Sequence, residues 1–402
     1  MLSFANELKV SLPEHLMSTA RFQAMNRLLT VNSEWKKEAY YQIKTVLLKM
    51  YENGASDMEM GGHGSNNRIW YRIYGTKAPA EEFGEINHDV ASFMLMSLMS
   101  EEHKVDLFKN KNADLSVGFK VEGSDTDARY RCDIYYENNS LAGSFRRINQ
   151  KLFPLESLGF EEPILRRLNL NHEKRGLVLV TGITGSGKSS TLDAVIHNNN
   201  VECKGHIIII GNPIEFIHNS ISCIIRHREV GEDVLGFKAG AREALRQDPD
   251  IIVVGEMRDP ETMEMVLEIT DSGHKVFSTM HTSSAVDSIH RVIGEFPPNE
   301  QERVRMRLAD TLSVVVSQKL VPTIDEKLVL AKEVLSVNAS VVAAIKNNNV
   351  GEIYQMISEG KKHGMISIEQ DLYNLCKKGI ITRENALNYS NNKNRMTQLM
   401  QY

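Results

Sequence analysis

Continuous runs of apolar residues alternate with helical stretches in the second half of the chain. Four such runs lie at Leu177–Val180, Ile207–Ile210, Ile251–Val254 and Lys275–Thr279. Strands that are apolar throughout are buried on both faces, which is typical of a parallel sheet covered by helices. The pattern therefore predicts an α/β domain in this part of the chain.

The first part of the chain has a different texture. Apolar residues recur at three- and four-residue steps from Glu38 to Tyr51, which predicts an amphipathic helix. The segments Ile69–Tyr74, Leu115–Val121, Ala128–Tyr135 and Ser140–Arg146 predict short strands, the middle two as an antiparallel pair. We therefore expect a small α+β domain here.

Beyond Asn299 the pattern is mainly helical, with one further predicted strand at Leu328–Val334. Ser367 and Gln370 have the spacing of a capping box, and Thr382 is placed to cap the next helix. The whole pattern predicts an N-terminal extension (1–36), a small α+β domain (37–149), a linker (150–158), an α/β core (159–298) and a mainly helical C-terminal part (299–402).

Composition narrows the classes of partner. A net charge of −5 argues against nucleic acid as the main partner, because phosphate binding requires a basic surface. No apolar run has the length of a membrane span and the N-terminus lacks an export pattern, so we expect a cytoplasmic protein. The four cysteines are far apart and form no C-x-x-C, which disfavours metal ligation and disulfides.

The strongest chemical signal is the segment Gly182–Ser189, which fits G-x-x-x-x-G-K-[ST] between a predicted strand and a predicted helix. Such a loop cradles phosphates with backbone N–H groups, while Lys188 reaches the β- and γ-phosphates and Ser189 reaches Mg²⁺. The segment therefore predicts binding of Mg-ATP. The predicted nucleotide-binding residues are Gly182, Thr184, Gly185, Ser186, Gly187, Lys188, Ser189 and Ser190.

Hydrolysis also needs a carboxylate that orients or deprotonates water. Glu256 follows the run Ile251–Val254, and ligands of open α/β sheets lie at the carboxyl ends of strands. His274 and His281 flank the run Lys275–Thr279. An exposed loop glutamate and two structural histidines are the alternative interpretation.

Longer segments resemble a known family. Ala241–Met263 resembles the Walker B region of the secretion ATPases, and Gly273–Thr282 resembles their His box. The closest likeness is to PilT-type ATPases, the retraction motors of type IV pili. It extends from Gly54 to Ala386 and so covers most of the chain.

This resemblance implies a hexameric ring of RecA-like cores, in which a PAS-like N-terminal domain covers the nucleotide of the next subunit. It implies Glu256 as the catalytic base, with His274 and His281 coupling the γ-phosphate to domain motion. It also implies that three arginines face the neighbouring active site, although their positions fit a solvated face equally well. These are Arg129, Arg131 and Arg146.

One motif departs from the family. Its acidic box reads Glu-Asp-Pro-Ile-Glu, whereas this chain has Gly211 and Asn212 at the first two positions and keeps Glu215 at the last. Loss of a catalytic carboxylate costs ~10²–10⁴-fold in rate. The chain is therefore expected to be a slow ATPase or to arrange its water and metal differently.

The resemblance implies a motor at the cytoplasmic face of the inner membrane that works on a platform protein and powers pilus retraction and twitching motility. The segment from Ser317 to Glu333 lacks the four-cysteine zinc module of assembly ATPases, which favours the retraction branch or the type IV secretion and conjugation ATPases. A slow or non-hydrolysing regulatory subunit is the second alternative, and a nucleic-acid translocase is disfavoured by the acidic balance.

Overall fold

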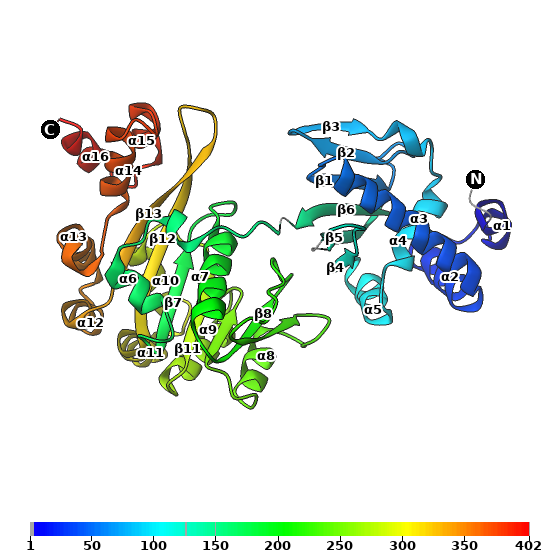
Figure 1. Ribbon diagram of the computed structural model, residues 1–402. Coiled ribbons are helices and arrows are strands. Elements are labelled where there is room, and N and C mark those ends of the chain that lie inside the picture. Colours follow the sequence, from blue (N-terminus) through cyan, green and yellow to red (C-terminus); the bar gives the residue numbers. More distant parts are fainter. Residues whose placement is uncertain (1–3, 125–126, 149, 402) are drawn as a thin grey trace. The chain divides into compact units, whose positions relative to one another are not determined.

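A computed structural model describes residues 4–124, 127–148 and 150–401. The chain forms two compact units, Met1–Gln150 and Lys151–Tyr402 (Figure 1). The predicted α/β class is confirmed, since a mixed sheet covered by helices forms the second unit and a smaller α+β unit precedes it.

Unit 1 is built on an antiparallel sheet of six strands in the order β3-β2-β1-β6-β5-β4. Its strands are β1 (Asp57–Gly61), β2 (Trp70–Ile73), β3 (Thr76–Pro79), β4 (Asn112–Phe119), β5 (Ala128–Glu137) and β6 (Ser140–Ile148). Its helices are α1 (Phe4–Ser11), α2 (Ser18–Val31), α3 (Ser33–Glu52), α4 (His88–Ser97), α5 (Glu101–Asn110) and the short 3₁₀ helix η1 (Glu81–Phe83).

The N-terminal helices belong to the core of unit 1. The ring centroids of Phe4 on α1 and Phe93 on α4 are 5.1 Å apart. Those of Phe22 on α2 and Tyr136 on β5 are 4.9 Å apart, in an edge-to-face arrangement. Both phenylalanines are buried in the same cluster as the sheet. The described residues before Glu38 are therefore part of the core of this unit.

Unit 2 contains a sheet of seven strands in the order β13-β12-β7-β11-β10-β8-β9. All neighbours are parallel except β12 and β13. The strands are β7 (Gly176–Thr181), β8 (His206–Gly211), β9 (Ile224–Glu229), β10 (Ile251–Val254), β11 (Lys275–Met280), β12 (Leu312–Pro322) and β13 (Leu328–Ser336).

Helices cover both faces of this sheet. Alternate strand residues such as Val254 pack with α8 to α13, and their neighbours such as Val253 pack with α6 and α7. The helices are α6 (Glu162–Leu168), α7 (Lys188–Glu202), α8 (Phe237–Ala244), α9 (Pro260–Asp271), α10 (Ala285–Gly294), α11 (Pro298–Thr311), α12 (Ala339–Lys346) and α13 (Ile353–Glu359), with 3₁₀ turns η2 (Leu155–Leu158), η3 (Val350–Glu352) and η4 (Lys361–His363). The four predicted parallel strands are confirmed.

The C-terminal helices α14 (Ile368–Lys377), α15 (Arg383–Tyr389) and α16 (Lys393–Leu399) pack on the far ends of β12 and β13. Ser367 and Gln370 form the predicted capping box, and Thr382 caps α15 as predicted. None of the helices in the described ranges is long and apolar enough to cross a membrane.

Four strands were not predicted. Of these, β3 and β9 are edge strands, and β1 is short and carries two acidic residues. The important omission is β12, which lies parallel to β7 beside the phosphate loop. Its apolar run follows α11 without a break, so the sequence pattern continued to indicate helix there.

The packing of α2 against the core of unit 1 can be tested at Phe22. Phe22→Ala should lower the free energy of unfolding of this unit by about 3–5 kcal/mol, because the side chain is buried and leaves a cavity. Both tryptophans, Trp35 and Trp70, lie in unit 1, so intrinsic fluorescence during urea unfolding of the full chain reports on this unit. Val31→Ala, at an exposed position of the same helix, is the control. Equal effects of both changes would contradict the packing of α2.

Candidate nucleotide-binding and hydrolysis site

The phosphate loop connects the end of β7 to the start of α7. Gly182, Gly185 and Gly187 have φ angles of 150°, 80° and 86°, which residues other than glycine rarely adopt. A Cβ atom on Gly182 would lie 2.5 Å from the main-chain oxygen of Gln318. The glycines are therefore needed both for the curvature of the loop and for its close approach to β12.

The start of α7 is suited to an anion. Gly187 is its N-cap and no side chain caps the helix, so its first-turn N–H groups are available to a ligand. The Lys188 ammonium donates hydrogen bonds to the carbonyl oxygens of Gly182 (2.9 Å) and Ile183 (3.1 Å) and so lies against the loop. The Ser186 hydroxyl is buried without a partner in the described structure. These groups fit the phosphates of a nucleotide.

The remaining predicted loop residues frame this cradle. Thr184, Gly185 and Ser189 are exposed, and Ser190 is half-buried in the first turn of α7. Burial lowers the pKa of Lys188, whereas the negative charge of Glu256 acts to raise it. The ammonium and this carboxylate therefore interact across the loop.

Glu256 lies just beyond the end of β10, between an arginine and a histidine. Its Oε2 forms an ion pair with Nε of Arg258 at 2.7 Å, and its Oε1 lies 3.1 Å from Nε2 of His281. Only 17% of the Glu256 side chain is exposed. The structure thus brings together Lys188, Glu256 and His281, which lie far apart in the sequence.

The environment of His281 favours the neutral ring. Burial is the largest effect that lowers its pKa, and the charges of Lys188, Arg258 and Arg291 act in the same direction against Glu256. Since the ordinary pKa of histidine is about 6.5, the ring is mainly neutral at pH 7. A neutral imidazole can donate one hydrogen bond and accept another beside the loop.

His274 lies elsewhere. It precedes β11 whereas His281 follows it, so the two rings are separated by roughly 20 Å of extended chain. The ring of His274 lies 3.0 Å from the hydroxyl of Ser272. Its position excludes direct contact with phosphates held by the loop of the same chain, and its predicted role in coupling stays a prediction.

The altered acidic box lies at the end of β8. Gly211 ends this strand, and Asn212 and Glu215 are exposed beyond it. Since β8 is parallel to β10, the box lies at the same edge of the sheet as Glu256. The first two positions of the box, Gly211 and Asn212, therefore bring no carboxylate to this edge.

Two groups near the loop were missed. The amide of Gln318 on β12 donates to the carbonyl oxygen of Ser186 at 2.8 Å, and the hydroxyls of Ser317 and Thr181 lie 2.8 Å apart. Arg258 was not singled out either, although it pairs with Glu256. The apolar run Leu312–Val316 followed by Ser317 has the pattern of the other strands and was the available signal.

Unit 1 gathers the three predicted arginines on one face of its sheet. Arg129 and Arg131 are two residues apart on β5 and so lie on the same face, and Arg146 on β6 lies directly opposite Arg131. Arg129 is buried, whereas Arg131 and Arg146 are exposed. Asp114 pairs with Arg131, and Asp57 pairs with Arg146.

Comparisons with known proteins agree with this geometry. The chain is 39% identical over 301 residues to the "Type IV pilus retractation ATPase PilT" of Pseudomonas aeruginosa, covering 75% of this chain and 85% of that protein. It is 36% identical over 327 residues to a "Twitching motility protein" of Neisseria gonorrhoeae, covering 81% and 83%. A crystal structure of the pilus retraction motor PilT with bound ADP matches with a TM-score of 0.77 and 36% identity, over 88% of this chain and 98% of that one.

The family model described as "Type II/IV secretion system protein" matches residues 36–395, nearly the whole chain. The predicted resemblance is therefore confirmed, and the chain belongs to the type II/IV secretion system protein family.

Proposed function

We propose that this chain is a subunit of an ATP-hydrolysing motor that powers the retraction of a type IV pilus. The observation that carries the proposal is the convergence of the glycine loop, Lys188, Glu256 and His281 at one edge of the sheet. The relatives named above, a pilus retraction ATPase and a twitching motility protein, support the kind of work to which hydrolysis is coupled.

The residues of unit 2 have complementary roles in hydrolysis. The loop N–H groups and Lys188 would hold the β- and γ-phosphates, and the Ser189 hydroxyl would bind a Mg²⁺ ion that arrives with ATP. Glu256 orients the attacking water and accepts its proton, while neutral His281 hydrogen-bonds to Glu256 or to the γ-phosphate. Arg258 forms an ion pair with the other carboxylate oxygen and so restricts the motion of Glu256.

The arginines of unit 1 are the second half of the proposal. In a hexameric ring, Arg129, Arg131 and Arg146 of one subunit would stabilise the charge of the γ-phosphate bound to the next. Arginines supplied in this way are worth on the order of 10³–10⁵ in rate. Hydrolysis would then require assembly, and the ring would work peripherally on a platform protein of the inner membrane.

Steady-state hydrolysis tests this proposal. The purified chain with Mg-ATP should show turnover that rises with protein concentration as rings form. Lys188→Ala should abolish it, and Glu256→Gln should lower kcat by ~10²–10⁴-fold while nucleotide binding is retained. Lys362→Ala, which removes an exposed lysine of η4, is the control and should behave as the unaltered protein. Turnover that survives Lys188→Ala would contradict the proposal.

Gly211 and Asn212 favour a second candidate, a slow or silent regulatory subunit, because carboxylates are lacking at the end of β8. A side chain at Gly211 can be accommodated only if its neighbours move, because its Cβ would lie 2.8 Å from Cδ1 of the buried Ile214 and 3.1 Å from the Pro213 oxygen.

Gly211→Glu combined with Asn212→Asp should therefore raise the turnover of the motor at least about 10-fold, since it restores carboxylates near the metal. Gly211→Ala is the matched control, because it adds the same Cβ without a carboxylate. Absent turnover in the unaltered chain, recovered only by the acidic pair, would favour the regulatory subunit instead of the motor.

A further inference from the structure

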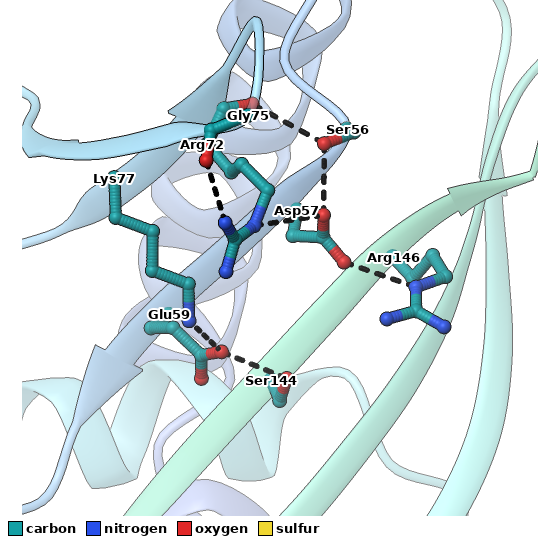
Figure 2. A network of polar contacts seen from close by, with 8 residues as sticks. All are labelled: Ser56, Asp57, Glu59, Arg72, Gly75, Lys77, Ser144 and Arg146. Atoms are coloured by element: carbon teal, nitrogen blue, oxygen red, sulfur yellow. Dashed lines mark hydrogen bonds and ion pairs between the residues drawn. The ribbon is translucent and has the colours of Figure 1, made fainter.

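A row of charged residues crosses the sheet of unit 1. Lys77, Arg72, Asp57, Arg146 and Arg131 are successive cross-strand partners on β3, β2, β1, β6 and β5. Asp57 is the single carboxylate among these five side chains and stands between two arginines (Figure 2). The row therefore holds four cationic side chains and one acid, and Glu59 and Asp114 on neighbouring positions pair with Lys77 and Arg131.

Two of these arginines face each other directly. Side chains opposite each other on antiparallel strands have Cβ atoms about 4.5–5.5 Å apart, and like charges there repel. Arg131 is drawn toward β4 by Asp114, and Arg146 is drawn toward β1 by Asp57. The two carboxylates thus separate the guanidinium groups in opposite directions.

The two pairs differ in the atoms they use. Asp114 accepts from both Nε (3.2 Å) and Nη2 (2.5 Å) of Arg131, so it occupies one edge of that guanidinium. Asp57 accepts from Nε of Arg146 at 3.0 Å, and within the described residues this is the one polar contact of that side chain. Figure 2 shows both terminal nitrogens of Arg146 directed away from Asp57. They are free to bind an anion, and 75% of the side chain is exposed.

Asp57 is itself held firmly. Its Oδ2 accepts a hydrogen bond from the Ser56 hydroxyl at 2.8 Å and lies 3.5 Å from Nε of Arg72. Arg72 is fixed in turn by a 2.7 Å hydrogen bond to the carbonyl oxygen of Gly75. Burial acts to raise the pKa of Asp57, but the hydrogen bonds from Ser56 and Arg146 and the charges of both arginines lower it overall. The carboxylate is therefore ionised at neutral pH.

We propose that Asp57 is a positioning residue for Arg146. Its hydrogen bond to Nε orients the guanidinium so that both terminal nitrogens can bind a phosphate of a neighbouring subunit. A fork of two parallel N–H groups matches two oxygens of a phosphate. The inference rests on the proposed function, because Arg146 acts there across the subunit boundary. Asp57 would then affect the rate of ATP hydrolysis only by orienting Arg146.

The test is a double-mutant cycle in the assembled full chain. Asp57→Asn keeps the shape of the side chain but removes its charge, and it should lower kcat about 10-fold while KM for ATP changes less than about 3-fold, because orientation in the transition state is lost. Arg146→Ala should lower kcat by more than this, roughly 10²-fold or beyond. In the Arg146→Ala background, Asp57→Asn should change kcat less than 2-fold.

Glu59→Gln is the matched control. Glu59 lies two residues further along β1 on the same face, and its Oε1 accepts from Lys77 (2.8 Å) and from the Ser144 hydroxyl (3.2 Å), without contacting an arginine (Figure 2). Removal of the Glu59 charge should leave kcat unchanged. Tryptophan fluorescence during unfolding shows whether each variant retains unit 1, because Trp70 lies on β2 of the same sheet.

Three results would overturn the inference. An equal loss of kcat from Asp57→Asn with and without Arg146 would give Asp57 a structural role. Unchanged turnover in Arg146→Ala, with turnover still abolished in Lys188→Ala, would remove the role of Arg146 but leave the ATPase intact. Absence of turnover in the unaltered chain would remove the proposed function and this inference with it.

Discussion

Burial of both faces of the seven-stranded sheet is the constraint on which the site depends. Because helices cover each face, polar groups of the central strands can reach solvent only where those strands end. The strands β7, β10 and β11 run parallel, so their carboxyl ends meet at one edge. The phosphate loop, Glu256 and His281 follow these three ends and therefore converge there. The same geometry places His274 at the opposite edge.

Both units place a carboxylate between two nitrogen-bearing side chains, at least one of which is an arginine. Glu256 lies between Arg258 and His281, and Asp57 lies between Arg72 and Arg146. The side chains of Arg258 and Arg146 are 66% and 75% exposed, and ion pairs with such exposed partners typically contribute only about 0–1 kcal/mol to stability. Their importance here is directional, since a carboxylate that occupies one edge of a guanidinium determines where its remaining N–H groups point.

The end of β8 shows how little space surrounds the altered acidic box. A Cβ atom on Gly255 would lie 3.3 Å from Cα of Gly211 and 3.1 Å from the oxygen of Ile210. The ends of β8 and β10 therefore meet backbone to backbone, next to Glu256. Glycine at 211 fits this packing, and Glu256 supplies the carboxylate whose charge acts on Lys188 of the loop.

The sequence by itself determined the local chemistry: the phosphate loop, the four buried parallel strands, the helix caps and the residues that follow each strand. These are encoded in short segments, where glycine spacing and hydrophobic periodicity have direct conformational causes. Only the tertiary structure decided which groups meet. It placed Gln318 of the unpredicted β12 on the phosphate loop, Arg258 and His281 on opposite oxygens of Glu256, and Asp57 beside Arg146. Strand order and register decide such contacts, and they arise from packing between segments far apart in the chain, which a local pattern does not record.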